Sequence, residues 1–207
     1  LRSLIPAIVG TGAKSIAVGF MHAYANPAHE LRVGEILSEM APDVSVSLSS
    51  EVCPEIREFE RFTTTSANAY VRPLMSSYLG RLQERLTALG VTCPVLMMTS
   101  GGGLAALETA RRFPIRLVES GPAGGAILAT QIASELALDK VISFDMGGTT
   151  AKICMIENQT AGKAREFEVD RQARFMKGSG LPLRIPVIEM VEIGAGGGSI
   201  ARVDAMN

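Results

Sequence analysis

The chain has 207 residues, of which 47% are hydrophobic and 20% charged, and its formal net charge is -1 at pH 7. This much apolar material can build one large or two small packed domains, so the composition excludes an intrinsically disordered chain. The near balance of charges gives no overall positive field that would draw the chain onto nucleic acid or an anionic membrane surface.

The three cysteines, Cys53, Cys93 and Cys154, stand far apart and form no C-x-x-C pair. This pattern argues against a disulfide framework and favours a reducing, cytoplasmic compartment. No apolar run approaches the roughly 18 residues of a membrane span, so we expect no membrane association. Because the sequence opens on Leu1 and stops just past a glycine-rich loop, we expect an internal piece of a longer protein.

The first part of the chain is predicted to form a strand, a helix and a second strand. Residues 16–21 are an apolar run of strand length. Asn26 is a suitable N-cap, Pro27 suits the first helical position, and the apolar positions at 33–40 have helical spacing. Residues 44–48 alternate between apolar and polar side chains, which is typical of a strand.

A long helix and two further elements are expected next. One apolar stripe runs through residues 71–89 until Gly90 ends it, with Pro73 in the first turns or at a kink. Residues 95–98 predict a buried strand, and residues 124–136 predict a helix rich in small side chains. Strands that alternate with helices of this length predict an α/β architecture with a largely parallel sheet.

The pattern changes at Val141. Residues 141–156 predict two strands joined by a tight glycine turn, a β-hairpin that would open a second lobe. Residues 162–186 are basic and read as a polar excursion, before a last strand at 187–193. We therefore divide the chain into residues 1–139 and residues 140–207.

The strongest functional signal is the hairpin turn, where Asp145 ends a buried strand and Gly147, Gly148, Thr149 and Thr150 follow. A nucleotide phosphate with Mg²⁺ needs a carboxylate that contacts the hydrated metal, together with main-chain N–H groups and hydroxyls for the phosphate oxygens. The sequence is neither a Walker A loop nor a Rossmann fingerprint. The alternative is a β-turn whose aspartate accepts local hydrogen bonds.

A second glycine-rich loop contains Gly196, Gly197 and Gly198. It is followed at residues 200–204 by the alternation of a strand, which a flexible linker would not need. We therefore expect either a hairpin or a backbone pressed close to another group. An ordinary turn is the alternative.

Two groups of polar residues are weaker candidates for substrate contacts. His22, His29 and Glu30 lie between a predicted strand and a helix start, where α/β folds bind ligands, although Glu30 would equally complement the helix N-terminus. Arg57, Glu58 and Arg61 belong to a run of alternating charge. Most such runs are solvated faces, so this run is either a surface or one wall of a site.

Four segments together resemble the hydantoinase A and 5-oxoprolinase family: residues 48–73, SGPAGG at 120–125, FDMGGTTAK at 144–152 and IGAGGGSIARVD at 193–204. The hairpin turn also resembles the second phosphate loop of the actin, hexokinase and sugar-kinase superfamily. The resemblance implies parts of two lobes of an actin/ribonuclease H-like ATPase fold, with mixed sheets and crossover helices. Residues 1–139 would then be the end of the first lobe with its connecting helix.

The function that this resemblance implies is ATP- and Mg²⁺-dependent opening of a cyclic amide of the hydantoin or 5-oxoproline type. The complete protein would work with a hydantoinase B-type partner, and this piece alone would be inactive. A carboxylase subunit of the acetone carboxylase type, a small-molecule kinase and a non-catalytic assembly subunit are the alternatives. Many relatives carry an acidic residue where this sequence has Lys152, so no catalytic acid carries over to that position, and the general base is not identified.

Overall fold

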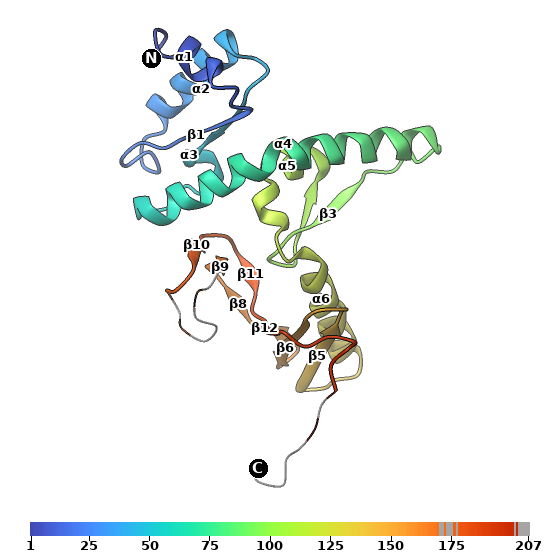
Figure 1. The fold of residues 1–207 in the computed structure, drawn as a ribbon. Coiled ribbons are helices and arrows are strands. Elements are labelled where there is room, and N and C mark those ends of the chain that lie inside the picture. Colours follow the sequence, from blue (N-terminus) through green and yellow to red (C-terminus); the bar gives the residue numbers. More distant parts are fainter. Residues whose placement is uncertain (170–171, 173–175, 177, 201, 203–207) are drawn as a thin grey trace.

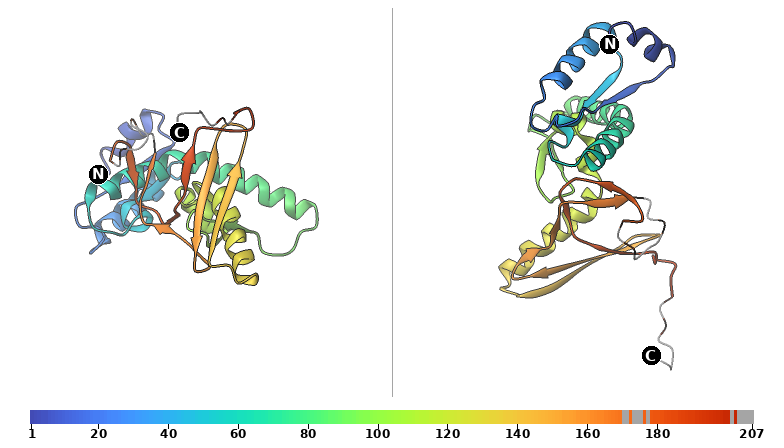
Figure 2. Two further views of the ribbon diagram at one scale, coloured as in Figure 1. Left: turned by 90° about the horizontal axis from the view of Figure 1, so that it is seen from below. Right: turned by 90° about the vertical axis from the view of Figure 1, so that its left-hand side faces the viewer.

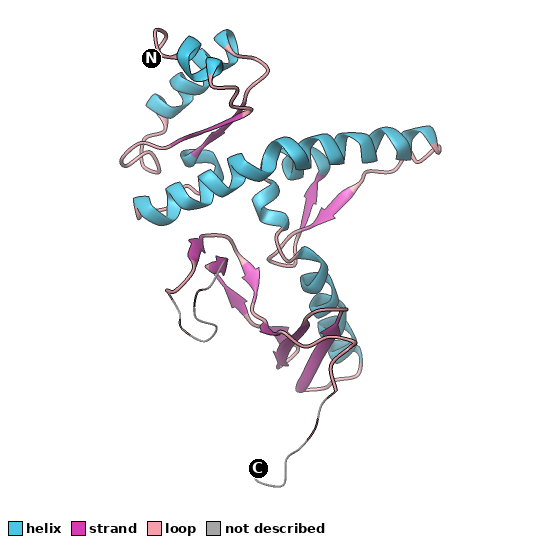
Figure 3. Ribbon diagram, in the orientation of Figure 1, coloured by secondary structure: helices cyan, strands magenta, loops and turns pink. Residues whose placement is uncertain are grey.

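A computed structural model of the chain describes residues 1–169, 172, 176, 178–200 and 202. Most helices come early in the chain, and the later part consists mainly of short strands (Figure 3). A long helix, α4, runs between an N-terminal α/β unit and the C-terminal sheets (Figure 1). Within these residues, no helix has the length and apolar character that a membrane crossing requires.

The N-terminal unit contains α1 (Ile5–Gly10), β1 (Ser15–Val18), α2 (Ala28–Met40) and β2 (Ser45–Leu48). The two strands pair in parallel, and α2 connects them, which confirms the predicted strand–helix–strand unit. Five side chains form its core: Ile5, Val18, Leu37, Ala41 and Leu48. The helix begins slightly later than predicted, because Pro27 is its N-cap and the Asn26 side chain accepts a hydrogen bond from the N–H of Ala28 at 3.1 Å.

After α3 (Ser49–Val52), α4 extends from Glu58 to Ala88. The predicted start near residue 71 is therefore wrong, and Pro73 lies inside the helix rather than in its first turns. The first half of α4 buries polar side chains, with the hydroxyls of Thr64 and Thr65 bonded to carbonyls one turn earlier. An apolar stripe cannot reveal a helix whose buried face is polar.

The next elements are β3 (Leu96–Met98), β4 (Leu104–Ala106), α5 (Leu107–Arg112) and the 3₁₀ turn η1 (Pro114–Leu117). β3 and β4 pair antiparallel. Asn68 of α4 joins this region to the N-terminal unit. Its side-chain amide donates to Ser47 Oγ at 3.0 Å and to the carbonyl of Arg112 at 3.2 Å, and its oxygen accepts from the N–H of Ile115 at 3.3 Å.

The C-terminal part begins with α6 (Ser120–Glu135), which packs on a sheet of β5 (Lys140–Met146), β6 (Ala151–Glu157), β7 (Thr160–Ala161) and β12 (Val191–Ile193). The strand order is β12-β6-β5, with β7 also paired to β6. The β5–β6 hairpin confirms the prediction for residues 141–156. Small side chains of α6, including Ala123 and Ala126, contact Cys154 and Ile156 on the inner face of the sheet.

The next four described strands form two small antiparallel pairs. β8 (Lys163–Ala164) pairs with β11 (Val187–Ile188), and β9 (Phe167–Val169) pairs with β10 (Leu181–Leu183). The predicted polar excursion therefore contains strands, and the single strand expected at 187–193 is split between two sheets. The expected largely parallel sheet is also wrong, since β1–β2 is the only parallel pair among the described strands. Most of the pairing strands lie close together along the chain, where short turns favour antiparallel pairing.

Candidate functional site

Asp145 lies near the end of β5, opposite Lys152 of β6 in the hairpin register. The turn between the strands is closed by the N–H of Gly147, which donates to the carbonyl of Thr150 at 2.9 Å. Asp145 and the turn residues Gly147, Gly148 and Thr149 are all exposed. This turn is called the phosphate loop below, and its residues are 145–150.

The second glycine loop, residues 194–199, packs directly against the phosphate loop. The N–H of Gly197 donates to the carbonyl of Gly147 at 3.0 Å. A Cβ placed on Gly196 would lie 2.3 Å from the carbonyl oxygen of Gly148 and 2.6 Å from the nitrogen of Thr149, so only glycine fits there. The expectation of a backbone pressed close to another group is confirmed, whereas the strand expected at 200–204 falls mostly outside the described residues.

The phosphate loop keeps hydrogen-bond donors available. Within the described chain, the N–H groups of Gly148 and Thr149 donate to no acceptor. The same residues hold no cluster of three or more His, Cys, Asp or Glu side chains suited to a metal ion. A lone exposed carboxylate beside free N–H groups fits a largely hydrated Mg²⁺ that is held mainly by a nucleotide's phosphates.

Lys152 is held by carboxylates on both sides. Its ammonium pairs with Glu119 and lies 3.8 Å from a carboxylate oxygen of Glu192 on β12. Glu119 is the N-cap of α6 and adopts a left-handed conformation with φ 60°. These ion pairs link the start of α6 to β6, which follows the phosphate loop, and link β6 to β12.

A second polar cluster lies in the N-terminal half, around the carboxylate of Glu30. Glu30 is fully buried. One of its oxygens accepts from the hydroxyl of Ser49 at 2.6 Å and from the N–H of Phe20 at 2.8 Å. The other oxygen accepts from the N–H of Ser50 at 2.8 Å. The carboxylate therefore joins α2 to the end of β1 and to the start of α3.

Arg61 of α4 completes this cluster and is also fully buried. Its Nε donates to Ser49 Oγ at 3.2 Å, Nη1 donates to the carbonyl of Glu55 at 2.8 Å, and Nη2 donates to the carbonyl of Phe20 at 3.0 Å. Nη2 also pairs with Glu58 at 3.2 Å. Through these four bonds the guanidinium fixes the loop after β1 and the start of α4.

Of the other four candidates in this half of the chain, His22 and Glu58 contact the buried cluster, whereas His29 and Arg57 do not. The main-chain N–H of His22 donates to Glu58 at 3.2 Å, and this bond and the Arg61 guanidinium hold the pKa of Glu58 below its usual value. Glu58 therefore stabilises the fold at neutral pH, and this contribution disappears as the pH falls through its folded pKa. His29 is exposed on the first turn of α2, and the side chain of Arg57 is exposed near Glu60, so neither joins the cluster.

The two groups of candidates occupy different ends of the molecule. The Glu30–Arg61 cluster belongs to the unit at the start of α4, whereas the phosphate loop lies in the sheet below α6, and the views in Figures 1 and 2 agree on their separation. Within the described chain, the sequence-predicted residues therefore form one exposed loop site and one buried cluster, with His29 and Arg57 outside both. They do not converge on a single centre.

Replacing Glu30 with glutamine should lower the free energy of unfolding by about 2 kcal/mol, because the amide group cannot accept the buried N–H that the second carboxylate oxygen accepts. Urea unfolding followed by circular dichroism measures this loss. Glu39→Gln is a matched control, since that carboxylate pairs with Arg2 on the surface and both side chains are 53% exposed. Equal unfolding midpoints for the two variants would contradict the prediction.

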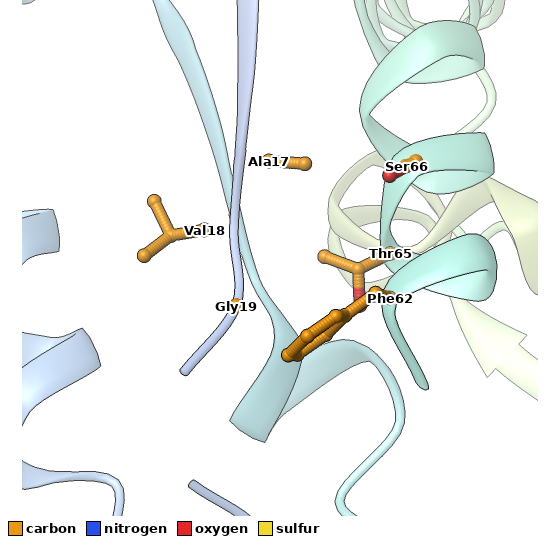
Figure 4. A pocket seen from close by; sticks show the side chains of 6 residues that line it. All are labelled: Ala17, Val18, Gly19, Phe62, Thr65 and Ser66. Carbon is orange, nitrogen blue, oxygen red and sulfur yellow. The ribbon is translucent and has the colours of Figure 1, made fainter. Parts of the chain in front are cut away.

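A small pocket of about 210 Å³ separates the end of β1 from α4 (Figure 4). Phe62, Thr65 and Ser66 of α4 face Ala17 and Gly19, whereas Val18 points away from α4. The six lining residues include no titratable side chain, so the pocket offers neither an acid nor a base.

Comparison with known proteins identifies the family of the chain. Residues 61–207 match the hydantoinase/oxoprolinase family, and residues 1–41 match the hydantoinase/oxoprolinase N-terminal region. The chain belongs to the hydantoinase/oxoprolinase family. This confirms the resemblance found in the sequence motifs.

Two curated relatives of this hydantoinase/oxoprolinase chain are enzymes that act on cyclic amides by name. Caprolactamase subunit alpha of Pseudomonas jessenii is 34% identical over 92% of this chain, which covers 26% of the relative. The 5-oxoprolinase of Dictyostelium discoideum is 33% identical over 91% of this chain, which covers 15% of the relative. The chain thus spans about a quarter or less of the length of these proteins.

Two solved structures share the fold. The ATP-dependent caprolactamase from Pseudomonas jessenii matches 99% of the chain with a TM-score of 0.79 and 31% identity, and the chain covers 28% of it. The nucleotide-free acetone carboxylase matches 99% with a TM-score of 0.78 and 24% identity, and the chain again covers 28%. The α/β class and the actin-like ATPase fold are confirmed by this likeness.

Proposed function

We propose that the protein of which this chain is part opens a cyclic amide at the expense of ATP. The observation that carries this proposal is the contact between the two glycine loops, which places Gly196 against Gly148 beside the exposed carboxylate of Asp145. Such a pair of loops lets phosphate oxygens approach main-chain N–H groups without side-chain interference. The relatives that are named caprolactamase and 5-oxoprolinase support a lactam or a related ring as the substrate.

In this proposal the residues of the phosphate loop bind and orient ATP. The N–H groups of Gly148 and Thr149 donate to phosphate oxygens, and the hydroxyls of Thr149 and Thr150 add further donors. Asp145 contacts the metal through water, and Mg²⁺, when bound, neutralises negative charge that develops on the phosphates. Phosphoryl transfer from ATP to the amide oxygen activates the carbonyl carbon for addition of one water. Cleavage of the C–N bond in the adduct then opens the ring and leaves an amine and an acyl phosphate. A second water displaces phosphate from the acyl phosphate to give the carboxylate.

The division of the chain at residues 139 and 140 remains part of this proposal. Residues 1–139 would be the end of a first lobe that finishes with α6, and residues 140–207 would open the second lobe. ATP would then also need the phosphate loop of the first lobe, which we expect outside this chain. We therefore propose that residues 1–207 alone are inactive.

A partner and a compartment complete the proposal. The name of the caprolactamase relative marks it as one subunit of a larger enzyme, which supports a multi-subunit assembly with a hydantoinase B-type partner. All three cysteines are free, and Cys53 and Cys154 are buried. Free thiols agree with a reducing compartment, and we propose the cytoplasm.

The test uses the full-length protein with its partner subunit, incubated with ATP and Mg²⁺ and, in separate reactions, with caprolactam, 5-oxoproline or hydantoin. We expect one ring-opened product for each phosphate released, measured by mass spectrometry and a phosphate assay. A phosphorylated product that accumulates without ring opening would indicate a kinase instead. A carboxylated product formed from acetone and bicarbonate would indicate a carboxylase, and failure to bind Mg-ATP would indicate an assembly subunit.

A further inference from the structure

Three carboxylates lie around Lys152: those of Glu119, Asp145 and Glu192. Among the described residues, the Lys152 ammonium forms ion pairs with Glu119 and Glu192 but not with Asp145. In the strand register, Lys152 of β6 lies opposite Asp145 of β5 on one side and opposite Glu192 of β12 on the other. The three side chains therefore form a row on one face of the sheet. This is the face that packs against α6, since Cys154 and Ile156 alternate on the same side. The ion pairs of Lys152 go to Glu119 and Glu192.

Asp145 is within reach of the same ammonium. Side chains directly opposite each other in an antiparallel pair have Cβ atoms about 5 Å apart, and the lysine stem is long enough to bring its charge to the facing carboxylate. An ion pair between Lys152 and Asp145 would neutralise the carboxylate that we assign to the metal. The structure instead leaves Asp145 exposed, with Lys152 directed to Glu119.

The position of Glu119 is unusual for an acidic residue at a helix start. It makes no side-chain cap on α6, although a carboxylate at an N-cap commonly accepts a hydrogen bond from the first turn. Its backbone is in the left-handed region, which costs a residue other than glycine about 1 kcal/mol or more. The gain that accompanies this conformation is the ion pair with Lys152, whose side chain is only 15% exposed.

We propose that Glu119 is a positioning residue that holds Lys152 away from Asp145 and so keeps the Asp145 carboxylate available for the hydrated cation of the nucleotide. This inference rests on the proposed function of the phosphate loop. It predicts that the charge of Lys152 becomes harmful only when Glu119 is neutralised. Neutralising Glu119 alone should therefore weaken cation binding at Asp145, and neutralising Glu119 and Lys152 together should restore it.

The test compares Glu119→Gln, Lys152→Met and the double variant in the full-length protein with its partner. Binding of a non-hydrolysable ATP analogue is measured by calorimetry over a series of Mg²⁺ concentrations, so the readout does not depend on turnover. We expect Glu119→Gln to raise the Mg²⁺ concentration for half-maximal binding about tenfold, because Lys152 then competes with the cation for Asp145. Lys152→Met and the double variant should both stay within about twofold of the unmodified protein.

Glu135→Gln is the matched control, because it removes one carboxylate from the same helix at a site where Glu135 bonds only Gln131 in the described chain. Melting temperatures of all variants separate folding from binding. If Glu119→Gln lowers the melting temperature but leaves the Mg²⁺ dependence unchanged, the ion pair is structural and the inference fails. If Lys152→Met and the double variant both bind the analogue weakly, Lys152 itself contacts phosphate and the inference also fails.

Asp145→Asn in the same series separates this inference from the proposed function. If Asp145→Asn leaves the Mg²⁺ dependence of binding unchanged, the metal role of Asp145 is wrong and the proposed function loses its basis in this loop. If Asp145→Asn alters that dependence and Glu119→Gln does not, the proposed function stands and only the role of Glu119 is wrong. A crystal structure of Glu119→Gln should show the ammonium of Lys152 within hydrogen-bond distance of Asp145.

Discussion

Gly196→Ala should weaken nucleotide binding by the full-length protein about 100-fold, the loss expected when one or two hydrogen bonds to charged phosphate oxygens are removed. The new Cβ would meet the carbonyl carbon and oxygen of Gly148 at 2.4 and 2.3 Å, and the nitrogen of Thr149 at 2.6 Å. All three atoms belong to the backbone, so no side chain can rotate away to make room. The two loops must separate, and the N–H donors that we assign to phosphate move with them.

Gly194→Ala is the matched control for this prediction. It lies in the same loop, and a Cβ placed there meets nothing within 4 Å. Binding of Mg-ATP, measured by calorimetry for both variants, should therefore differ strongly between them. Comparable affinities would mean that the contact between the loops does not set the geometry of the phosphate site.

Local sequence patterns were sufficient for the hairpin that carries the phosphate loop. Residues 141–156 combine two apolar strands with a Gly-Gly turn, and both signals are local in the sequence, so the prediction depended on no distant contact. The close approach of Gly196 was also partly predictable, because a cluster of glycines between strands indicates a backbone under tight constraint. Its partner, Gly148, could not be identified, since the two residues are brought together only by the pairing of β6 with β12.

The burial of Glu30 and Arg61 could not be predicted from local sequence patterns. Arg61 and Glu30 are ordinary surface residues by type, and a run of alternating charge usually forms a solvated face. Both are fully buried here because the hydroxyl of Ser49 and the main chain at Phe20 supply partners from other elements. The same burial of polar groups concealed the first half of α4. Only tertiary contacts decide whether such a charge faces water or protein.

Glu119 was missed for a related reason. In the sequence it precedes a Ser-Gly-Pro turn, and nothing nearby indicates an ion pair with a residue 33 positions away. Lys152 was already noted in the sequence, because the family resemblance implies an acidic residue at that position. The structure explains how a lysine is tolerated beside the phosphate loop, since Glu119 and Glu192 engage its charge. The pairing of these residues is thus a property of the fold around α6.

Asp145→Asn in the full-length protein should lower ATP turnover about 100-fold or more, which corresponds to about 2.7 kcal/mol of lost transition-state stabilisation. The amide keeps the shape of the side chain but removes the negative charge where the cation must sit. Asp145 is exposed at the end of β5, so the melting temperature should change little.

The opposite pattern would follow if Asp145 only satisfied the Gly-Gly turn. The melting temperature would then fall, and ATP turnover per folded molecule would stay near that of the unmodified protein. Both quantities are measured on one preparation, with Glu157→Gln as the control, because Glu157 is an exposed carboxylate at the far end of the same hairpin. The closure of the turn by Gly147 and Thr150 is made by main-chain atoms alone, which favours the electrostatic role of Asp145 over the structural one.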